Sequence, residues 1–137
     1  MKNSLSIFSL ILLLAIASSS CEEDLPTVTD PQQAILGKWE IIENTFGPVT
    51  SPSGYDEYLP DSVRISYSYE DETFYYEKYW FEDSLLIRSF EFIDAYDNND
   101  TTVFNLPYRY EFLNYNTLKL ELQFPAMNPI HIYQRIK

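Results

Sequence analysis

The chain has one cysteine, Cys21, and one histidine, His131, so few of its side chains could perform nucleophilic or metal chemistry. Catalytic triads and zinc sites need several such side chains close together. The three glycines are too widely spaced to form a phosphate-binding loop. We therefore expect His131 to be a surface or hydrogen-bonded strand residue. We predict no metal site and no cofactor, and we predict that the protein is not an enzyme.

Carboxylates are the other candidate ligands, because the chain carries 21 Asp and Glu residues. Asp94, Asp97 and Asp100 lie with Asn98 and Asn99 in one short segment, and hard oxygen ligands of this kind suit calcium. The same residues are typical of a hairpin turn, because Asn and Asp tolerate left-handed backbone angles. Since the run lacks EF-hand spacing, we favour a turn and leave calcium open for loop 94–100. Among so many acids, no pair stands out for glycoside hydrolysis.

The formal net charge of −12 bears on the partners of the protein. Such a surface repels the phosphates of nucleic acids and the head groups of anionic lipids. The composition therefore argues against a nucleic-acid-binding protein. It also argues against electrostatic docking on a membrane.

The N-terminus carries the pattern of an export signal. Lys2 precedes the apolar run Leu5–Ala17, and Ser18–Ser20 lead directly into Cys21. About 13 apolar residues suit a signal peptide, whereas a membrane-spanning helix needs roughly 20. The serines and the cysteine resemble the lipobox of bacterial lipoproteins, which implies cleavage after residue 20 and acylation of Cys21, for example with palmitate. The alternative is an ordinary secretory signal that leaves a free thiol.

Residues 21–34 are predicted to be a flexible acidic tether, because Pro26 and Pro31 interrupt a segment with few apolar residues. Glu22, Glu23 and Asp24 directly follow the cysteine. They resemble the signals that carry some lipoproteins to the outer face of the outer membrane, although a solvated linker would look the same. We expect a lipid-anchored outer-membrane protein with one folded domain at 35–137, and we leave open whether it is exposed at the cell surface.

The folded domain is predicted to be all-β. Aromatic residues make up 17% of the chain, and apolar and polar residues alternate with period two. The long Pro/Gly/Ser-rich segment 47–60 is expected to be a loop. Consecutive hairpins favour an antiparallel up-and-down meander barrel of seven to eight strands, with a β-sandwich as the alternative. The expected strands cover residues 35–46, 61–70, 73–81, 85–96, 101–106 continuing at 108–113, 117–124 and 130–137, with a bulge or sheet edge at Pro107.

The start of the first expected strand resembles a known family. Gly37 and Trp39, in the sequence Leu-Gly-Lys-Trp-Glu, are similar to the Gly-x-Trp motif of lipocalins. In that family an arginine near the end of the barrel packs across the tryptophan, and Arg135 is the matching position. The resemblance implies a barrel closed by Gly37, Trp39 and Arg135 through a cation–π contact. It also implies that loop 47–60 covers the barrel mouth.

Aromatic residues supply the candidate ligand site, because tyrosine combines an apolar face with a polar tip. We expect a small hydrophobic or amphiphilic ligand, and as alternatives a barrel filled by its own side chains or an accessory or inhibitory module that binds an envelope protein. The candidates at the barrel mouth are Phe46, Tyr55, Tyr58 and Leu59, and those in the interior are Tyr67, Tyr69, Tyr76 and Trp80, with Tyr108 and Tyr110 beside them.

Overall fold

The structure is a computed structural model that describes residues 28–93 and 101–137. The predicted signal peptide, the lipidation site Cys21 and the possible calcium loop 94–100 lie outside the described residues. Nine strands and one short helix make up the described part. The elements are α2 (Pro31–Ala34), β1 (Gly37–Asn44), β2 (Gly47–Pro48), β3 (Gly54–Tyr58), β4 (Val63–Ser68), β5 (Thr73–Glu82), β6 (Leu85–Ile93), β7 (Thr101–Asn114), β8 (Thr117–Leu122) and β9 (Ile130–Ile136).

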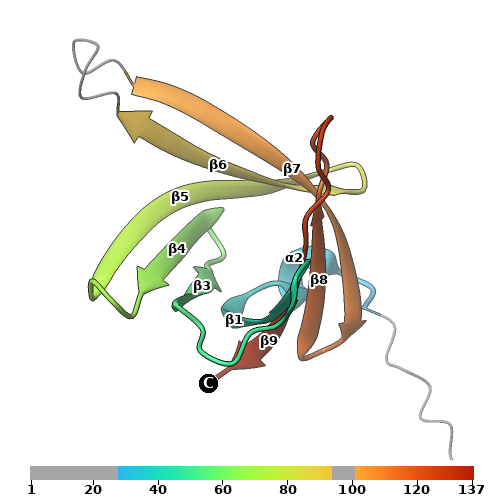
Figure 1. Cartoon of the computed structure of the whole chain (residues 1–137). Coiled ribbons are helices and arrows are strands. Elements are labelled where there is room, and N and C mark those ends of the chain that lie inside the picture. Colours follow the sequence, from blue (N-terminus) through green and yellow to red (C-terminus); the bar gives the residue numbers. More distant parts are fainter. Residues whose placement is uncertain (1–27, 94–100) are drawn as a thin grey trace, which may run out of the picture.

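The strands form one antiparallel sheet in which almost every strand pairs with its neighbour in sequence. The order is β2-β1-β3-β4-β5-β6-β7-β8-β9, and the additional pairing of β1 with β9 closes the sheet (Figure 1). Eight strands therefore form a closed barrel, and β2 is an extra short strand that pairs with the end of β1. The β1–β9 pairing removes the two edges that the ends of an open meander would leave. The predicted all-β up-and-down barrel is confirmed, and the β-sandwich alternative is wrong.

The prediction of one long loop over residues 47–60 is wrong, because the segment contains β2 and β3. β3 pairs with β1 on one side and with β4 on the other. A Cβ atom at Gly54 would lie 1.8 Å from the main-chain oxygen of Tyr67, so only glycine fits where these backbones approach. The Pro, Gly and Ser residues before β3 concealed a strand of only five residues in the sequence.

The predicted tether to Ala34 is also too long, because α2 occupies its last residues. The Asp30 carboxylate accepts hydrogen bonds from the main-chain N–H groups of Gln32 and Gln33, and Pro31 occupies the first turn. Both features are typical of a helix start. Among the residues that the structure describes, no helix has the length and apolar character to cross a bilayer.

Pro107 lies inside the continuous strand β7, and the β6–β7 register has no shift there. Its carbonyl accepts a hydrogen bond from the Gln123 N–H, so its peptide groups face β8 rather than β6. The β7–β8 ladder begins at Tyr108. The missing proline N–H therefore falls just beyond the end of a ladder, where it costs little. The predicted bulge lies elsewhere in β7, between Phe112 and Asn114.

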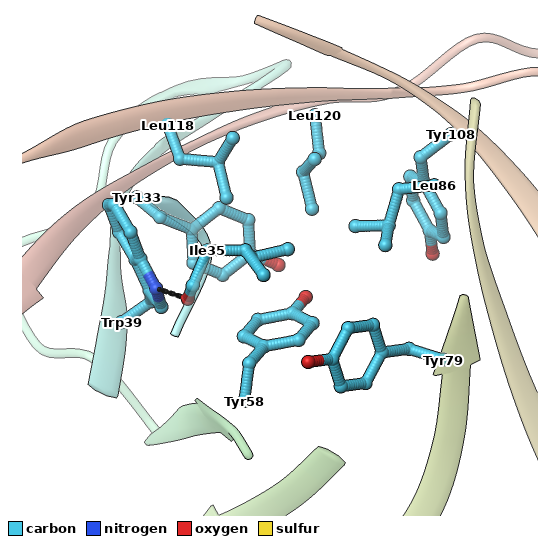
Figure 2. Packing of buried hydrophobic residues seen from close by; sticks show 9 residues of the cluster. All are labelled: Ile35, Trp39, Tyr58, Tyr79, Leu86, Tyr108, Leu118, Leu120 and Tyr133. Atoms are coloured by element: carbon cyan, nitrogen blue, oxygen red, sulfur yellow. Dashed lines mark hydrogen bonds between the residues drawn. The ribbon is translucent and has the colours of Figure 1, made fainter. Parts of the chain in front are cut away.

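The apolar core fills the end of the barrel that α2 covers. Ile35, which directly follows the helix, is fully buried among the ring and leucine side chains. The indole Nε1–H of Trp39 donates a 2.6 Å hydrogen bond to the Ile35 carbonyl (Figure 2). Tyr58 and Tyr79 meet edge to face with their ring centroids 5.0 Å apart. The cluster consists of Ile35, Trp39, Tyr58, Tyr79, Leu86, Tyr108, Leu118, Leu120 and Tyr133.

Candidate functional site

A layer of charged side chains lies inside the barrel, next to the apolar core. Asp56 is 7%, Arg64 6% and Arg88 8% exposed. One carboxylate oxygen of Asp56 accepts a hydrogen bond from Arg64, and the other accepts one from Arg88 at 2.8 Å. Arg64 also donates to the carboxylate of Glu77. The four side chains form one connected and electrically balanced network, as buried charges require.

The strand register brings these charges together from four strands. Arg64 on β4 lies opposite Tyr58 on β3 and opposite Glu77 on β5. Asp56 lies opposite Trp39, whose ring is part of the core. Since directly paired residues share a face of a sheet, the charged side chains and the core residues point into the same barrel.

Tyrosine rings surround Arg88. Its guanidinium lies over the ring of Tyr108, 5.3 Å from the centroid. Burial is the largest single influence on Arg88 and lowers its pKa, but the Asp56 carboxylate and the hydroxyls of Tyr58, Tyr133 and Tyr108 together outweigh it. The pKa of Arg88 is therefore raised well above its usual value. Burial raises the pKa of Asp56, which Arg88 counteracts. Burial also raises the pKa of Tyr133 to about 12, so its hydroxyl stays a neutral hydrogen-bonding group.

Two polar atoms in this layer have no hydrogen-bond partner among the described residues. They are the Nε–H of Arg64 and the hydroxyl of Tyr58. A buried donor without an acceptor costs about 1–3 kcal/mol, which makes such groups uncommon in folded proteins. The Arg64 Nε–H is therefore an unsatisfied donor in a side chain that lines the neighbouring cavity.

A cavity of about 370 Å³ lies next to the charged layer. Its wall combines the charged layer, hydroxyl groups and aromatic rings, so it offers polar and apolar surface side by side. The volume is near the lower end of the range for small-molecule sites. The lining residues are Trp39, Ile41, Ser53, Gly54, Tyr55, Asp56, Arg64, Ser66, Tyr67, Ser68, Tyr75, Arg88 and Tyr133.

His131 lies at the edge of this layer rather than on the outer surface. It shares an inward face of β9 with Tyr133, and the two rings meet edge to face with centroids 6.3 Å apart. Burial and the nearby Arg88 guanidinium lower the pKa of His131, although Asp56 acts in the opposite direction. The ring is therefore an uncharged, half-buried group at neutral pH.

Gly37, Trp39 and Arg135 meet at the closed end of the barrel. The Arg135 guanidinium lies 4.2 Å from the centroid of the Trp39 ring. It also donates hydrogen bonds to the carbonyls of Ala34 and Leu36. Gly37 has a φ of 109°, and a Cβ atom there would lie 3.0 Å from the guanidinium. Glycine is therefore required both by the backbone and by the close approach of the arginine.

The residues predicted to line the interior lie on the outer face instead. Tyr67 pairs with Tyr55 and Phe74, on the side of the sheet opposite to Arg64, although it still forms part of the cavity wall. Tyr69 is exposed and Tyr76 is 71% exposed. Trp80 lies on the same outer side by strand alternation. Of the predicted interior rings, those of Tyr108 and Tyr110 do point inward, where they join the core.

The four residues predicted at the barrel mouth are not brought together. Phe46 is 98% exposed, in the turn between β1 and β2. Tyr55 lines the cavity rim, with its ring on the outer face. Tyr58 is a core residue, and Leu59 is bound to the β4 start through its N–H to the Val63 carbonyl.

The sequence did not reveal the charged layer, because polar residues that alternate with apolar ones along a strand were expected to face solvent. Arg64, Ser66 and Ser68 alternate with apolar residues on β4, and this pattern normally indicates a wet outer face. One signal could have revealed that Arg64 points inward: Asp56 and Glu77 on the two flanking strands carry the opposite charge. The residues that the structure describes contain no group of three or more His, Cys, Asp or Glu side chains placed to hold a metal ion.

No protein-family model matches the chain. No curated protein sequence matches it either. The lipocalin resemblance therefore stays a prediction made on the Gly-x-Trp motif, while the barrel itself rests on the strand pairing.

Proposed function

We propose that the protein is a lipid-anchored envelope lipoprotein whose barrel binds a small amphiphilic molecule and performs no catalysis. The observation that carries the proposal is the cavity of about 370 Å³ beside the unpartnered Nε–H of Arg64. Aromatic rings in the wall suit an apolar group, and the free donor suits a head group that accepts a hydrogen bond. A purely hydrophobic ligand fits less well, because it would leave this donor unpaired.

Energy transfer from Trp39 to a bound probe tests the proposal. Trp39 lines the cavity and Trp80 lies outside, so the Trp80→Phe variant leaves one tryptophan as the donor. Anilinonaphthalene sulfonate is a suitable probe, because it joins fused rings to an acceptor-bearing head group. We expect saturable energy transfer from Trp39, and weaker transfer with phenylnaphthylamine, which lacks the sulfonate.

Two matched variants distinguish the cavity from the outer surface. Ser66→Phe places a ring in the cavity, whereas Ile65→Phe enlarges a neighbouring side chain on the outer face of the same strand. We expect Ser66→Phe to abolish saturable energy transfer and Ile65→Phe to leave it unchanged. Equal effects of the two variants, or no saturable transfer in the parent chain, would refute ligand binding in the barrel.

The anchor is tested separately, because it rests on residues 18–24 and not on the barrel. We infer that acyl chains on Cys21 hold the protein at the outer membrane, since several acyl chains on one residue anchor stably. Cells that express the chain should incorporate labelled palmitate into it, and Cys21→Ser should abolish the label. Labelling that persists in Cys21→Ser would show that this cysteine is not the lipidation site.

An interaction module is the second candidate function, and the outer aromatic face favours it. The Tyr67 ring lies 5.1 Å from that of Tyr55 and 4.6 Å from that of Phe74. The Tyr69 hydroxyl donates a 2.6 Å hydrogen bond to Glu40, and this bond orients the ring. The rings of Tyr69 and Phe74 in this cluster are exposed, and exposed rings gathered on one face are typical of a surface that contacts a partner.

A further inference from the structure

The barrel wall is open between β5 and β6. The two strands pair only where Lys78–Glu82 face Leu85–Ser89, and beyond this point they diverge (Figure 1). Residues 73–77 of β5 still pair with β4, and residues 90–93 of β6 still pair with β7. Each strand therefore has one free edge that faces the other. A cavity of about 770 Å³, here called the slot, lies between them, lined by Val63, Phe74, Tyr75, Tyr76, Glu77, Lys78, Ser89, Phe90 and Glu91.

The register shows which peptide groups face the slot. The Tyr79 N–H donates a 2.9 Å hydrogen bond to the Ser62 carbonyl, so the peptide groups of Tyr79 face β4. Successive residues of a strand direct these groups to alternate sides. The peptide groups of Phe74 and Tyr76 therefore face the slot from β5. The pairing of Lys78 with Ser89 places those of Glu91 on the opposite edge.

The two edges have little of the usual protection against strand addition, since Glu91 is the one charged side chain in residues 73–76 and 90–93. Native sheets protect exposed edges with lysine, proline or bulges. Residues 73–76 are Thr-Phe-Tyr-Tyr and residues 90–93 are Phe-Glu-Phe-Ile, which are strong strand formers without a lysine or a proline. The pairings of these segments on their other sides show no register shift. Such edges are suited to pairing with a further strand.

We propose that the slot binds an extended segment of another protein, which adds a strand between β5 and β6. Only an extended polypeptide presents N–H and C=O groups at the spacing of a strand edge, about 3.3 Å per residue. The exposed rings of Phe74 and Tyr76 on the β5 edge offer contacts for alternate side chains of that segment. The proposal stands whether or not the barrel cavity holds a small molecule.

Charge indicates that the partner segment is basic. The turn Glu70–Glu72 leads into the slot end of β5 and is exposed, and Glu91 lies exposed on the other edge. Lys78 is the one basic side chain in the slot lining, and Glu77 is bound to Arg64. A second copy of the chain fits poorly, because each copy carries a net charge of −12.

A short peptide of alternating lysine and valine tests the proposal on the full chain. Amide hydrogen exchange by NMR reports the peptide groups of Phe74, Tyr76 and Glu91 directly. We expect these amides to exchange rapidly in the free protein and to become protected when the peptide binds. The control is the same peptide with alternate backbone nitrogens methylated, which keeps the charge but removes edge donors. It should bind at least about tenfold more weakly, because several hydrogen bonds are lost.

Two variants at one position separate backbone pairing from side-chain contact. Tyr76→Pro removes an N–H that faces the slot, while Tyr76→Thr removes only the ring. We expect Tyr76→Pro to abolish protection at Phe74 and Glu91, and Tyr76→Thr to retain it. The proposal is overturned if the methylated peptide binds equally well, if the three amides are already protected in the free chain, or if their protection depends on protein concentration, which would indicate a second copy.

Discussion

Replacing Asp56 by Asn should destabilise the protein strongly. Asp56 is the centre of the buried charged layer, because its two carboxylate oxygens bind Arg64 and Arg88. In Asp56→Asn, Arg64 keeps Glu77 as its partner. Arg88 loses the only carboxylate that binds it among the described residues and remains 8% exposed. Removing one partner from a buried ion pair costs about 3–5 kcal/mol.

The expected loss of unfolding free energy in Asp56→Asn is large compared with the total stability of a small domain, which is about 5–15 kcal/mol. Urea unfolding followed by tryptophan fluorescence measures it, through the shift in midpoint at constant slope. The matched control is Glu111→Gln, which breaks the exposed 3.3 Å ion pair with Lys119. Exposed pairs contribute about 0.2–1 kcal/mol, so the control should shift the midpoint little.

A double variant tests whether the unpaired charge is the cause. Adding Arg88→Met to Asp56→Asn removes the orphaned guanidinium and keeps an apolar chain of similar length, so part of the lost stability should return. The reasoning is refuted if Asp56→Asn costs less than about 1 kcal/mol, the range of an exposed pair. It is also refuted if the two substitutions are simply additive.

The remaining predictions concern single contacts. Arg135→Met should lower the unfolding free energy by at least about 1–2 kcal/mol in urea unfolding, because the contact with Trp39 and three hydrogen bonds to carbonyls are lost; an unchanged midpoint would contradict the contact. The lowered pKa of His131 means that the unfolded chain binds the proton more tightly, so stability should fall as the pH drops below about 6.5, and His131→Gln should reduce that slope. Tyr69 should ionise at a pKa of about 12 in a spectrophotometric titration, mainly because its hydroxyl is bonded to Glu40, and Glu40→Gln should return it towards 10.

The strands were predictable because period two is a local property. Residues 63–68 and 117–122 alternate in the sequence as they do in β4 and β8. Which side chains of β4 point into the barrel was not predictable, because a small barrel can bury the residues of either face of this strand. Arg64 points inward only because Asp56 and Glu77 meet it from β3 and β5. That match depends on the register between three strands, which the sequence of one strand does not reveal.

The contacts at the closed end of the barrel were easier to predict from the sequence than the cavity. A Gly-x-Trp pair and a late arginine were enough to place Gly37, Trp39 and Arg135 together. The slot had no such signal, because the divergence of β5 from β6 is a property of curvature and not of composition. Both segments would serve equally well as paired strands.

The most direct test of the central claim is the NMR signal of the Arg64 side-chain Nε–H. This donor is buried, belongs to a side chain that lines the cavity and has no acceptor among the described residues. Saturation with anilinonaphthalene sulfonate should shift this signal markedly and slow its exchange with water, while phenylnaphthylamine should shift it little. A signal that stays unchanged while the exposed outer rings of Tyr69 and Tyr76 respond would contradict a ligand site inside the barrel.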